Sequence, residues 1–309
     1  MDFALSPDGR QIVFSASGVG GPQLWLRSLA TTTAQPLAGT EGARQPFWSP
    51  DGRSLGFFAS GALKRLDLAG GVAQSLAAAT GAYGGTWNAD GVILFAPSGS
   101  GPLMRVSASG GAVTAVTTLG SQEQSHTFPY FLPGGRQFVF SVAGSADTGG
   151  TYLGALDGSP AARLTNGARA VILPVPPDHA NASSERLWLL WVRGETLVAQ
   201  RLDGSKAALT GDIVTLADGF TGRTDRVISS GVSVSASGLV AYRQGPPGRI
   251  QLTWVDRSGK VLGTPAAAEE RDLLDPTLSP DGRRLALLCH LRSGACLRKL
   301  SSMPRSRRL

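Results

Sequence analysis

One short sequence, SPDGR, occurs three times in the chain of 309 residues, at 6–10, 49–53 and 279–283. Proline at its second position fixes φ near the value that the second residue of a type I turn requires. Aspartate tolerates the next position, and glycine then adopts the positive φ that returns the chain antiparallel. Apolar residues precede each copy, and alternating apolar residues follow it, as in QIVFSA at 11–16. Each copy therefore predicts a hairpin of two β-strands.

Weaker copies of this turn occur between the second and third SPDGR sequences: NADG at 88–91, LPGG at 132–135 and SASG at 235–238. The glycines that end the six turns are spaced by 39 to 44 residues, apart from one gap of 103 residues. We place a degenerate copy with a longer turn in that gap, at 175–192. A period of slightly more than ~40 residues is typical of propeller and solenoid repeats.

Each repeat continues with a third strand, a glycine-rich turn and a short fourth strand, as in GALKRLDL at 61–68, AGG at 69–71 and AQSLAA at 73–78. Four short antiparallel strands per repeat make one propeller blade. No stretch combines a helical period of apolar residues with capping residues, so almost no helix is expected. We therefore predict an all-β protein, a β-propeller with six complete blades of four antiparallel strands. The alternative is a ring of seven blades whose last blade is incomplete.

The predicted propeller covers residues 3–288. Its repeats lie near 3–43, 44–82, 83–127, 128–170, 171–230 and 231–275, followed by a partial repeat at 276–288. Residues 289–309 form a basic tail, which we predict to be disordered or aberrant sequence because its composition does not suit a blade. The tail holds both cysteines, Cys289 and Cys296, which are either two free thiols or one bridge. It also holds six basic residues and no acidic one, which is nearly all of the net charge of +7.

Several repeats resemble a known family. The segments are FALSPDGRQIVFSA at 3–16, PFWSPDGRSLGFFASGALKRLDLAGG at 46–71, GGTWNADGVILFAPS at 84–98 and SVSASGLVAYR at 233–243. They resemble the TolB-like propeller repeat, in the version that bacterial receptor-like Ser/Thr protein kinases carry at their C-terminal end. The resemblance implies a non-catalytic module for ligand sensing or protein interaction, outside the cytoplasm. It also implies that the chain is a fragment of such a kinase or of a TolB-like envelope protein.

Charge and hydropathy limit the classes of partner and the cellular compartments that are expected for the chain. Without its basic tail the chain is almost neutral, so no nucleic-acid surface is expected on the ring. The sequence opens within the first repeat, without the charged and apolar regions of a signal peptide. No apolar run reaches the length of a membrane span, so no membrane insertion is expected. As written, the chain is therefore predicted to be cytoplasmic, whereas the resemblance implies the other side of the membrane.

The motifs of common enzymes give no catalytic assignment. Kinase motifs are absent, the one Gly-Lys pair at 259–260 is followed by valine, and the three histidines lie far apart in sequence. The chain also has no α/β segment that could hold the nucleophile elbow of a serine peptidase. We therefore predict no enzyme activity, no cofactor and no metal. The alternative is the propeller part of a serine peptidase, or a propeller hydrolase or lyase that uses residues at the channel.

The predicted binding surface consists of the loops that lead from each fourth strand into the next first strand. These loops converge around the axis on one face of a propeller, and concave loop surfaces with a few polar groups commonly bind ligands. Such loops suit a peptide or carbohydrate-like ligand, so a protein or peptide is the expected partner and a small ligand the second candidate. His126 precedes a first strand and is predicted to face the channel, with a packing histidine as the alternative. The candidate residues are Arg44, Gln124, His126, Arg223, Asp225, Arg226, Arg271 and Asp272, with Gln45, Gly84 and Gly85 on the same loops.

Overall fold

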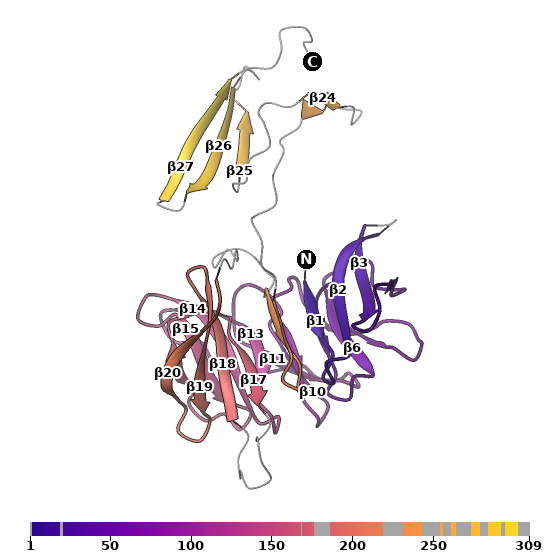
Figure 1. Ribbon diagram of the computed structural model, residues 1–309, viewed down its shortest axis with the longest axis vertical. Helices are drawn as coiled ribbons and strands as arrows, with labels where there is room; N and C mark the ends of the chain where they lie inside the picture. The colour runs from indigo at the N-terminus through magenta and orange to yellow at the C-terminus, as the bar shows by residue number, and fades with distance from the viewer. Residues whose placement is uncertain are drawn as a thin grey trace. The chain divides into compact units, whose positions relative to one another are not determined.

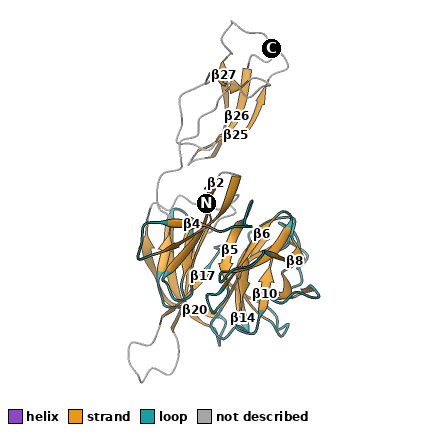
Figure 2. Ribbon diagram, turned by 90° about the vertical axis from the view of Figure 1, so that its right-hand side faces the viewer, coloured by secondary structure: helices purple, strands orange, loops and turns teal. Residues whose placement is uncertain are grey.

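A computed structural model describes residues 2–18, 21–167, 169–175, 186–218 and 231–242, together with the backbone of short segments between 254 and 301. The chain divides into two units, Met1–Gln244 and Gly245–Leu309, and each is described by itself. All regular structure in the described residues is β-strand (Figure 2), as the sequence predicts.

The described residues of the first unit contain five antiparallel sheets of four strands (Figure 1), and β13 of the fourth sheet crosses the predicted boundary between residues 127 and 128. The first blade has β1 (Phe3–Leu5), β2 (Gln11–Gly18), β3 (Gly21–Ser28) and β4 (Ala34–Pro36). The second has β5 (Arg44–Trp48), β6 (Ser54–Ala59), β7 (Ala62–Asp67) and β8 (Gln74–Ala78). The third has β9 (Gly85–Trp87), β10 (Val92–Phe95), β11 (Met104–Ser107) and β12 (Thr114–Ala115).

The fourth and fifth blades have the longest strands. The fourth has β13 (Glu123–Phe131), β14 (Gln137–Gly144), β15 (Gly150–Ala155) and β16 (Ala162–Thr165). The fifth has β17 (Val171–Val175), β18 (Arg186–Arg193), β19 (Thr196–Asp203) and β20 (Ala208–Ala217). β17 and β18 pair with Val171 opposite Leu190, which supports the degenerate repeat that the sequence places between the fourth and fifth of the six turns.

A hairpin of two strands, β21 (Val232–Val234) and β22 (Val240–Tyr242), takes the sixth place in the ring. The first strands of neighbouring blades contact one another from β1 to β17, and β21 contacts both β17 and β1. The backbone amide of Leu5 donates a 2.9 Å hydrogen bond to Ser233 Oγ, which ties β1 to β21. The prediction of six complete blades, and its seven-bladed alternative, is therefore wrong for the described residues, which form five complete blades and one hairpin.

The first two SPDGR turns have the predicted conformation, whereas the third, at 279–283, lies outside the described residues. In the first SPDGR copy, the amide of Gly9 donates to the carbonyl of Ser6 at 2.9 Å, and Gly9 has φ of 70°. In the second, Gly52 donates to Ser49 at the same distance with φ of 69°. The aspartate side chain belongs to its own turn, because Asp51 Oδ1 accepts the Ser49 hydroxyl at 2.6 Å and the Arg53 amide at 3.0 Å.

Replacing Asp51 with asparagine is expected to weaken the dependence of stability on acid pH. The Ser49 hydroxyl, followed by the Arg53 amide, lowers the pKa of the Asp51 carboxyl below its ordinary 3.8. A carboxyl whose pKa is depressed by folding stabilises the folded state above its unfolded pKa and loses that contribution as pH falls below it. Urea midpoints at neutral pH and at about pH 3 should therefore differ less for Asp51→Asn than for the wild type. Equal differences would contradict the role of this carboxylate.

The hydrophobic core lies between successive blades rather than in one central cluster. Between the second and third blades, Phe58 and Leu63 pack with Ile93, Phe95 and Val106, all nearly or completely buried. Equivalent clusters join the other neighbouring blades, and the last one joins the fifth blade to Val232 and Val234 of the hairpin. Burial on both faces explains why the central strands read as continuous apolar runs, such as SLGFFA in β6.

The second unit contains a pair of short strands and one sheet of three strands. β23 (Trp254–Val255) pairs with β24 (Val261–Gly263). β25 (Leu273–Leu278), β26 (Arg284–Leu291) and β27 (Gly294–Ser301) form an antiparallel sheet in that order. The predicted boundary between partial repeat and tail, after residue 288, lies within β26, and the register places Cys289 opposite Cys296.

Candidate binding site

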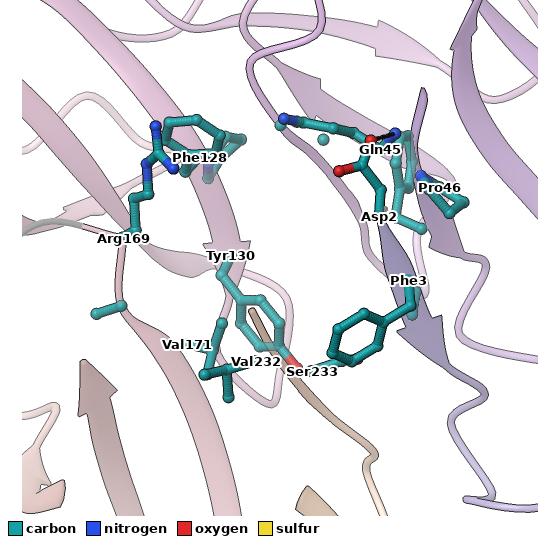
Figure 3. Close-up of a pocket in the computed structure, with 16 residues that line it drawn as sticks. Asp2, Phe3, Gln45, Pro46, Phe128, Tyr130, Arg169, Val171, Val232 and Ser233 are labelled. Atoms are coloured by element: carbon teal, nitrogen blue, oxygen red, sulfur yellow. Dashed lines mark hydrogen bonds between the residues drawn. The ribbon is translucent and has the colours of Figure 1, made fainter. Parts of the chain in front are cut away.

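The first strands of the ring begin around one cavity of about 120 Å³ (Figure 3). Every blade and the hairpin contribute to it, mostly with the residues at or just before the start of the first strand. We call this place the channel mouth. Its lining residues are Asp2, Phe3, Ala4, Gln45, Pro46, Phe47, Gly84, Gly85, Phe128, Pro129, Tyr130, Arg169, Ala170, Val171, Val232 and Ser233.

Three residues that line the channel mouth have an unusual, left-handed backbone conformation. Gln45, Phe128 and Arg169 have φ of 46°, 52° and 58°, and Gly84 occupies the same region with φ of 94°. The pairing of β5 with β6 and of β13 with β14 is irregular at these points. Left-handed conformations of non-glycine residues cost about 1–3 kcal/mol each and concentrate at functional sites. Their recurrence in successive blades marks the channel mouth as the first candidate site.

Polar groups at the mouth come from separate blades. Asp2 Oδ2 accepts the backbone amide of Gln45 at 3.0 Å, which joins the start of the first blade to the second. The Gln45 side chain is only 9% exposed, and its Nε2 has no hydrogen-bond partner among the described residues. A buried donor without an acceptor costs about 1–3 kcal/mol, so an oxygen that accepted a hydrogen bond from this amide would recover that free energy.

The opposite side of the mouth carries a cation. The Arg169 guanidinium lies 4.4 Å from the centre of the Phe128 ring, and Figure 3 shows this pair across the cavity from Asp2 and Gln45. Such a cation–π contact holds the guanidinium in place while it keeps its charge. Tyr130 lies deeper, where burial raises the pKa of its phenol to about 12, and its hydroxyl donates to the Val234 carbonyl at 3.4 Å. The phenol is therefore neutral at physiological pH.

A wider cavity of about 410 Å³ continues toward the turns at the other end of the first strands. It shares Phe47 and Tyr130 with the channel mouth, so these two rings lie where one cavity meets the other. Its walls are mainly apolar and aromatic, with Trp48, Trp87 and Phe131 among them. The recurring turns contribute Pro7, Pro50, Pro133 and Ala236 to its lining, and β17 contributes Pro174.

The predicted site residues are only partly placed by the structure. Arg44 and Gln124 are exposed and do not line the channel mouth, although Gln45, Gly84 and Gly85 from the same loops do. Arg223, Asp225, Arg226, Arg271 and Asp272 lie outside the described residues. The sequence analysis did not single out Asp2, Phe128 and Arg169, which line the mouth.

His126 does not face the channel, contrary to the prediction. It is 3% exposed and packs edge-on to Phe140 at 5.0 Å between ring centres. Its Nδ1 lies 2.8 Å from Thr117 Oγ1, and its Nε2 lies 3.0 Å from Glu123 Oε2. An irregularity in β13 after residue 127 changes which residues face the axis, so Phe128 and Tyr130 reach the channel instead. His126 is the satisfied packing histidine that the sequence analysis gave as the alternative.

Replacing His126 with leucine is expected to destabilise the fold by about 1–3 kcal/mol, because Thr117 and Glu123 would lose a buried partner. Affinity at the channel mouth should not change. Chemical denaturation measures the first effect, and ligand titration the second. A variant that keeps wild-type stability but loses binding would contradict this assignment.

One sequence pattern of serine hydrolases does occur in the chain, where it forms part of a turn. Residues 52–56, GRSLG, have the letters of the G-x-S-x-G motif, yet they form an SPDGR turn and the start of β6 rather than a strand-to-helix elbow. The hydroxyl of Ser54 donates to Asp67 Oδ1, and Ser54 is 4% exposed.

The described residues contain no group of three or more histidine, cysteine, aspartate or glutamate residues placed to hold a metal. No helix of bilayer-spanning length and hydropathy occurs in the part of the chain that the structure describes.

Solved structures similar to this chain agree with the observed ring. A putative TolB from Agrobacterium tumefaciens aligns with a TM-score of 0.56 and 20% identity, covering 79% of this chain and 90% of that protein. The fold is a TolB-like β-propeller. TolB from Acinetobacter baumannii gives 0.52 and 16%, with 71% of this chain covering 54% of that protein, or about half its length.

An enzyme is also among the structural neighbours of this TolB-like propeller. An oligogalacturonate lyase in complex with manganese aligns with a TM-score of 0.50 and 16% identity, covering 99% of this chain and 89% of that protein. No protein-family model matches the sequence, and no curated protein matches it either. At these identities the neighbours show the fold alone, and the function has to be argued from the site.

Proposed function

We propose that this chain is a non-catalytic recognition module that binds a peptide or a small polar ligand at the channel mouth. The observation that carries the proposal is Gln45, a residue that lines the cavity and whose buried Nε2 lacks an acceptor among the described residues. Asp2 and Arg169 add charges of both signs from other blades. A concave, mostly apolar cavity with a few fixed polar groups is the usual form of a ligand site.

Selection of random peptides on the immobilised full chain tests this function. Enriched peptides should lose about tenfold or more of their affinity for Arg169→Ala, because a charged partner at a desolvated site is removed. The control is Arg105→Ala, since Arg105 lies on the exposed side of β11 and bonds Thr114 Oγ1 at 3.0 Å. Peptides that bind all three proteins equally would place recognition elsewhere.

We also propose that the module serves a larger protein, either a receptor-like Ser/Thr kinase or a TolB-like envelope assembly. The repeated turn sequences and the similarity to TolB propellers support this role. The DNA sequence on either side of the reading frame tests it. Kinase motifs and a membrane segment upstream would support the kinase, and unrelated neighbouring genes would oppose both assemblies.

An enzyme on the same ring is the second candidate, favoured by the likeness to the oligogalacturonate lyase. The test is incubation of the full chain with oligogalacturonate and manganese, followed by ultraviolet absorbance of an unsaturated product. Product formation that depends on the chain would replace the recognition module as the proposed function. Unchanged substrate would favour the recognition module.

A further inference from the structure

The channel mouth offers a hydrogen-bond donor to a ligand on one side. Gln45 Nε2 is buried and has no partner in the described residues, whereas the backbone amide of Gln45 is satisfied by Asp2. A primary amide nitrogen carries two donors and accepts nothing. The complementary ligand atom is therefore an oxygen with a lone pair, such as a carbonyl or a carboxylate.

The channel mouth also offers a hydrogen-bond acceptor that carries negative charge. Asp2 lines the cavity, and one of its carboxylate oxygens accepts the Gln45 amide at 3.0 Å. An ionised carboxylate has about four lone-pair positions, so it can take further donors beside that amide. Across the cavity, the guanidinium of Arg169 provides the opposite charge (Figure 3). A ligand that carries an ammonium group beside a carbonyl or carboxylate oxygen matches all three groups.

The channel mouth itself, apart from the wider cavity that adjoins it, has room for one small unit of a ligand. Its volume is about 120 Å³. An apolar cavity of about 150 Å³ in another protein accommodates benzene, so roughly six non-hydrogen atoms fit here. Alanine has that size, and so does the first residue of a peptide. A folded partner can therefore insert only its chain end into this cavity.

We infer that the channel mouth binds the amino end of an α-amino acid, either as the free molecule or as the first residue of a peptide. The ammonium group lies against Asp2, the carbonyl or carboxylate oxygen accepts from Gln45 Nε2, and Arg169 favours the anionic or dipolar end. Phe3 and Phe47 form apolar walls for a small side chain. This inference names the ligand class for the proposed recognition module and rests on it.

Calorimetric titration of the full chain with three small molecules tests the inference. L-Alanine has the ammonium and the carboxylate, L-alaninamide has the ammonium and a neutral carbonyl, and N-acetyl-L-alanine has no ammonium. We expect binding of alanine or alaninamide, and at least about tenfold weaker binding of N-acetylalanine, since its amide cannot pair as an ion with Asp2. Tighter binding of alanine indicates a free amino acid, whereas tighter binding of alaninamide indicates a peptide end.

Two variants and a control connect the binding to the site. Gln45→Glu replaces the donor with a carboxylate of nearly the same shape and should lower the affinity for alanine by about tenfold or more. Asp2→Asn should lower the affinity for both compounds that carry an ammonium group, alanine and alaninamide. Gln74→Glu makes the same change at an exposed residue of β8 and should have no effect. Matching circular dichroism spectra will show that the variants are folded.

Equal affinity for N-acetylalanine and alanine, or no binding of any of the three, would overturn the inference. The peptide selection described above separates this failure from failure of the proposed function. Selected peptides that depend on Arg169 but tolerate acetylation of their amino end would leave the recognition module intact and remove the amino-end ligand. Peptides whose affinity does not depend on Arg169 would contradict both the recognition module at the channel mouth and the amino-end ligand.

Discussion

Truncating Phe95 to alanine is expected to lower the free energy of unfolding by about 3–5 kcal/mol. Phe95 is completely buried in β10, and its cluster joins the second blade to the third. Loss of the ring removes apolar area from the interface and leaves a cavity that β-sheets on both sides cannot readily close. Urea unfolding of the full chain, followed by intrinsic fluorescence, measures the change in midpoint.

A matched surface change shows whether this effect comes from packing between blades. Val72→Ala removes apolar atoms from a side chain that is 86% exposed, so it should change stability by less than about 0.5 kcal/mol. The free energy of unfolding of Phe95→Leu should lie between those of Phe95→Ala and Val72→Ala, because leucine fills part of the cavity. If Phe95→Ala were as stable as Val72→Ala, the second and third blades would not share the core described above.

Gly56→Ala is expected to destabilise the protein by about 1–3 kcal/mol or more, although it adds only one methyl group. A Cβ at Gly56 would overlap the ring of Phe47, and a Cβ at Gly85 would meet the same ring from the next blade. Phe47 therefore lies between two glycines on neighbouring blades, and a methyl group added at Gly56 must displace its ring. Since the ring also lines the channel mouth, ligand affinity should fall together with the urea midpoint.

A double-mutant cycle separates this clash from other effects of the substitution. Phe47→Leu shortens the side chain, so Gly56→Ala should cost less in that background than in the wild type. The two single variants and the double variant give the coupling free energy between the positions. Additive effects would mean that the methyl group does not meet the Phe47 ring.

The blades were predictable because local chemistry and long-range repetition agree. Proline, aspartate and glycine specify the same turn wherever SPDGR occurs in the described chain, and the strands on both sides follow from alternating apolar residues. The completeness of the last blade was not predictable in this way. Residues 249–257 have the letters of a third strand, yet letters alone do not decide whether a strand joins the hairpin of β21 and β22.

The channel mouth was only partly predictable. Gln45, Gly84 and Gly85 of the predicted loops line the mouth, as does Phe128, whereas His126 does not. The bulge in β13 that causes this difference is not visible in the sequence. A positional rule would have found more of the site. The residue four positions before each turn sequence is Asp2, Gln45, Gly84 and Phe128 in the first four blades, and all four line the mouth. Arg169 escapes this rule because its repeat has lost the turn sequence.

The side-chain amide of Gln45 is the most direct probe of the whole account, since it is the buried donor without an acceptor. In nitrogen–proton correlation spectra of the full chain, the Gln45 side-chain pair is identified by its absence from Gln45→Glu. Titration with whichever of alanine and alaninamide binds should shift this pair strongly, while the amide pair of Gln74 stays unchanged. An unmoved Gln45 pair at saturating ligand would show that recognition does not take place at the channel mouth.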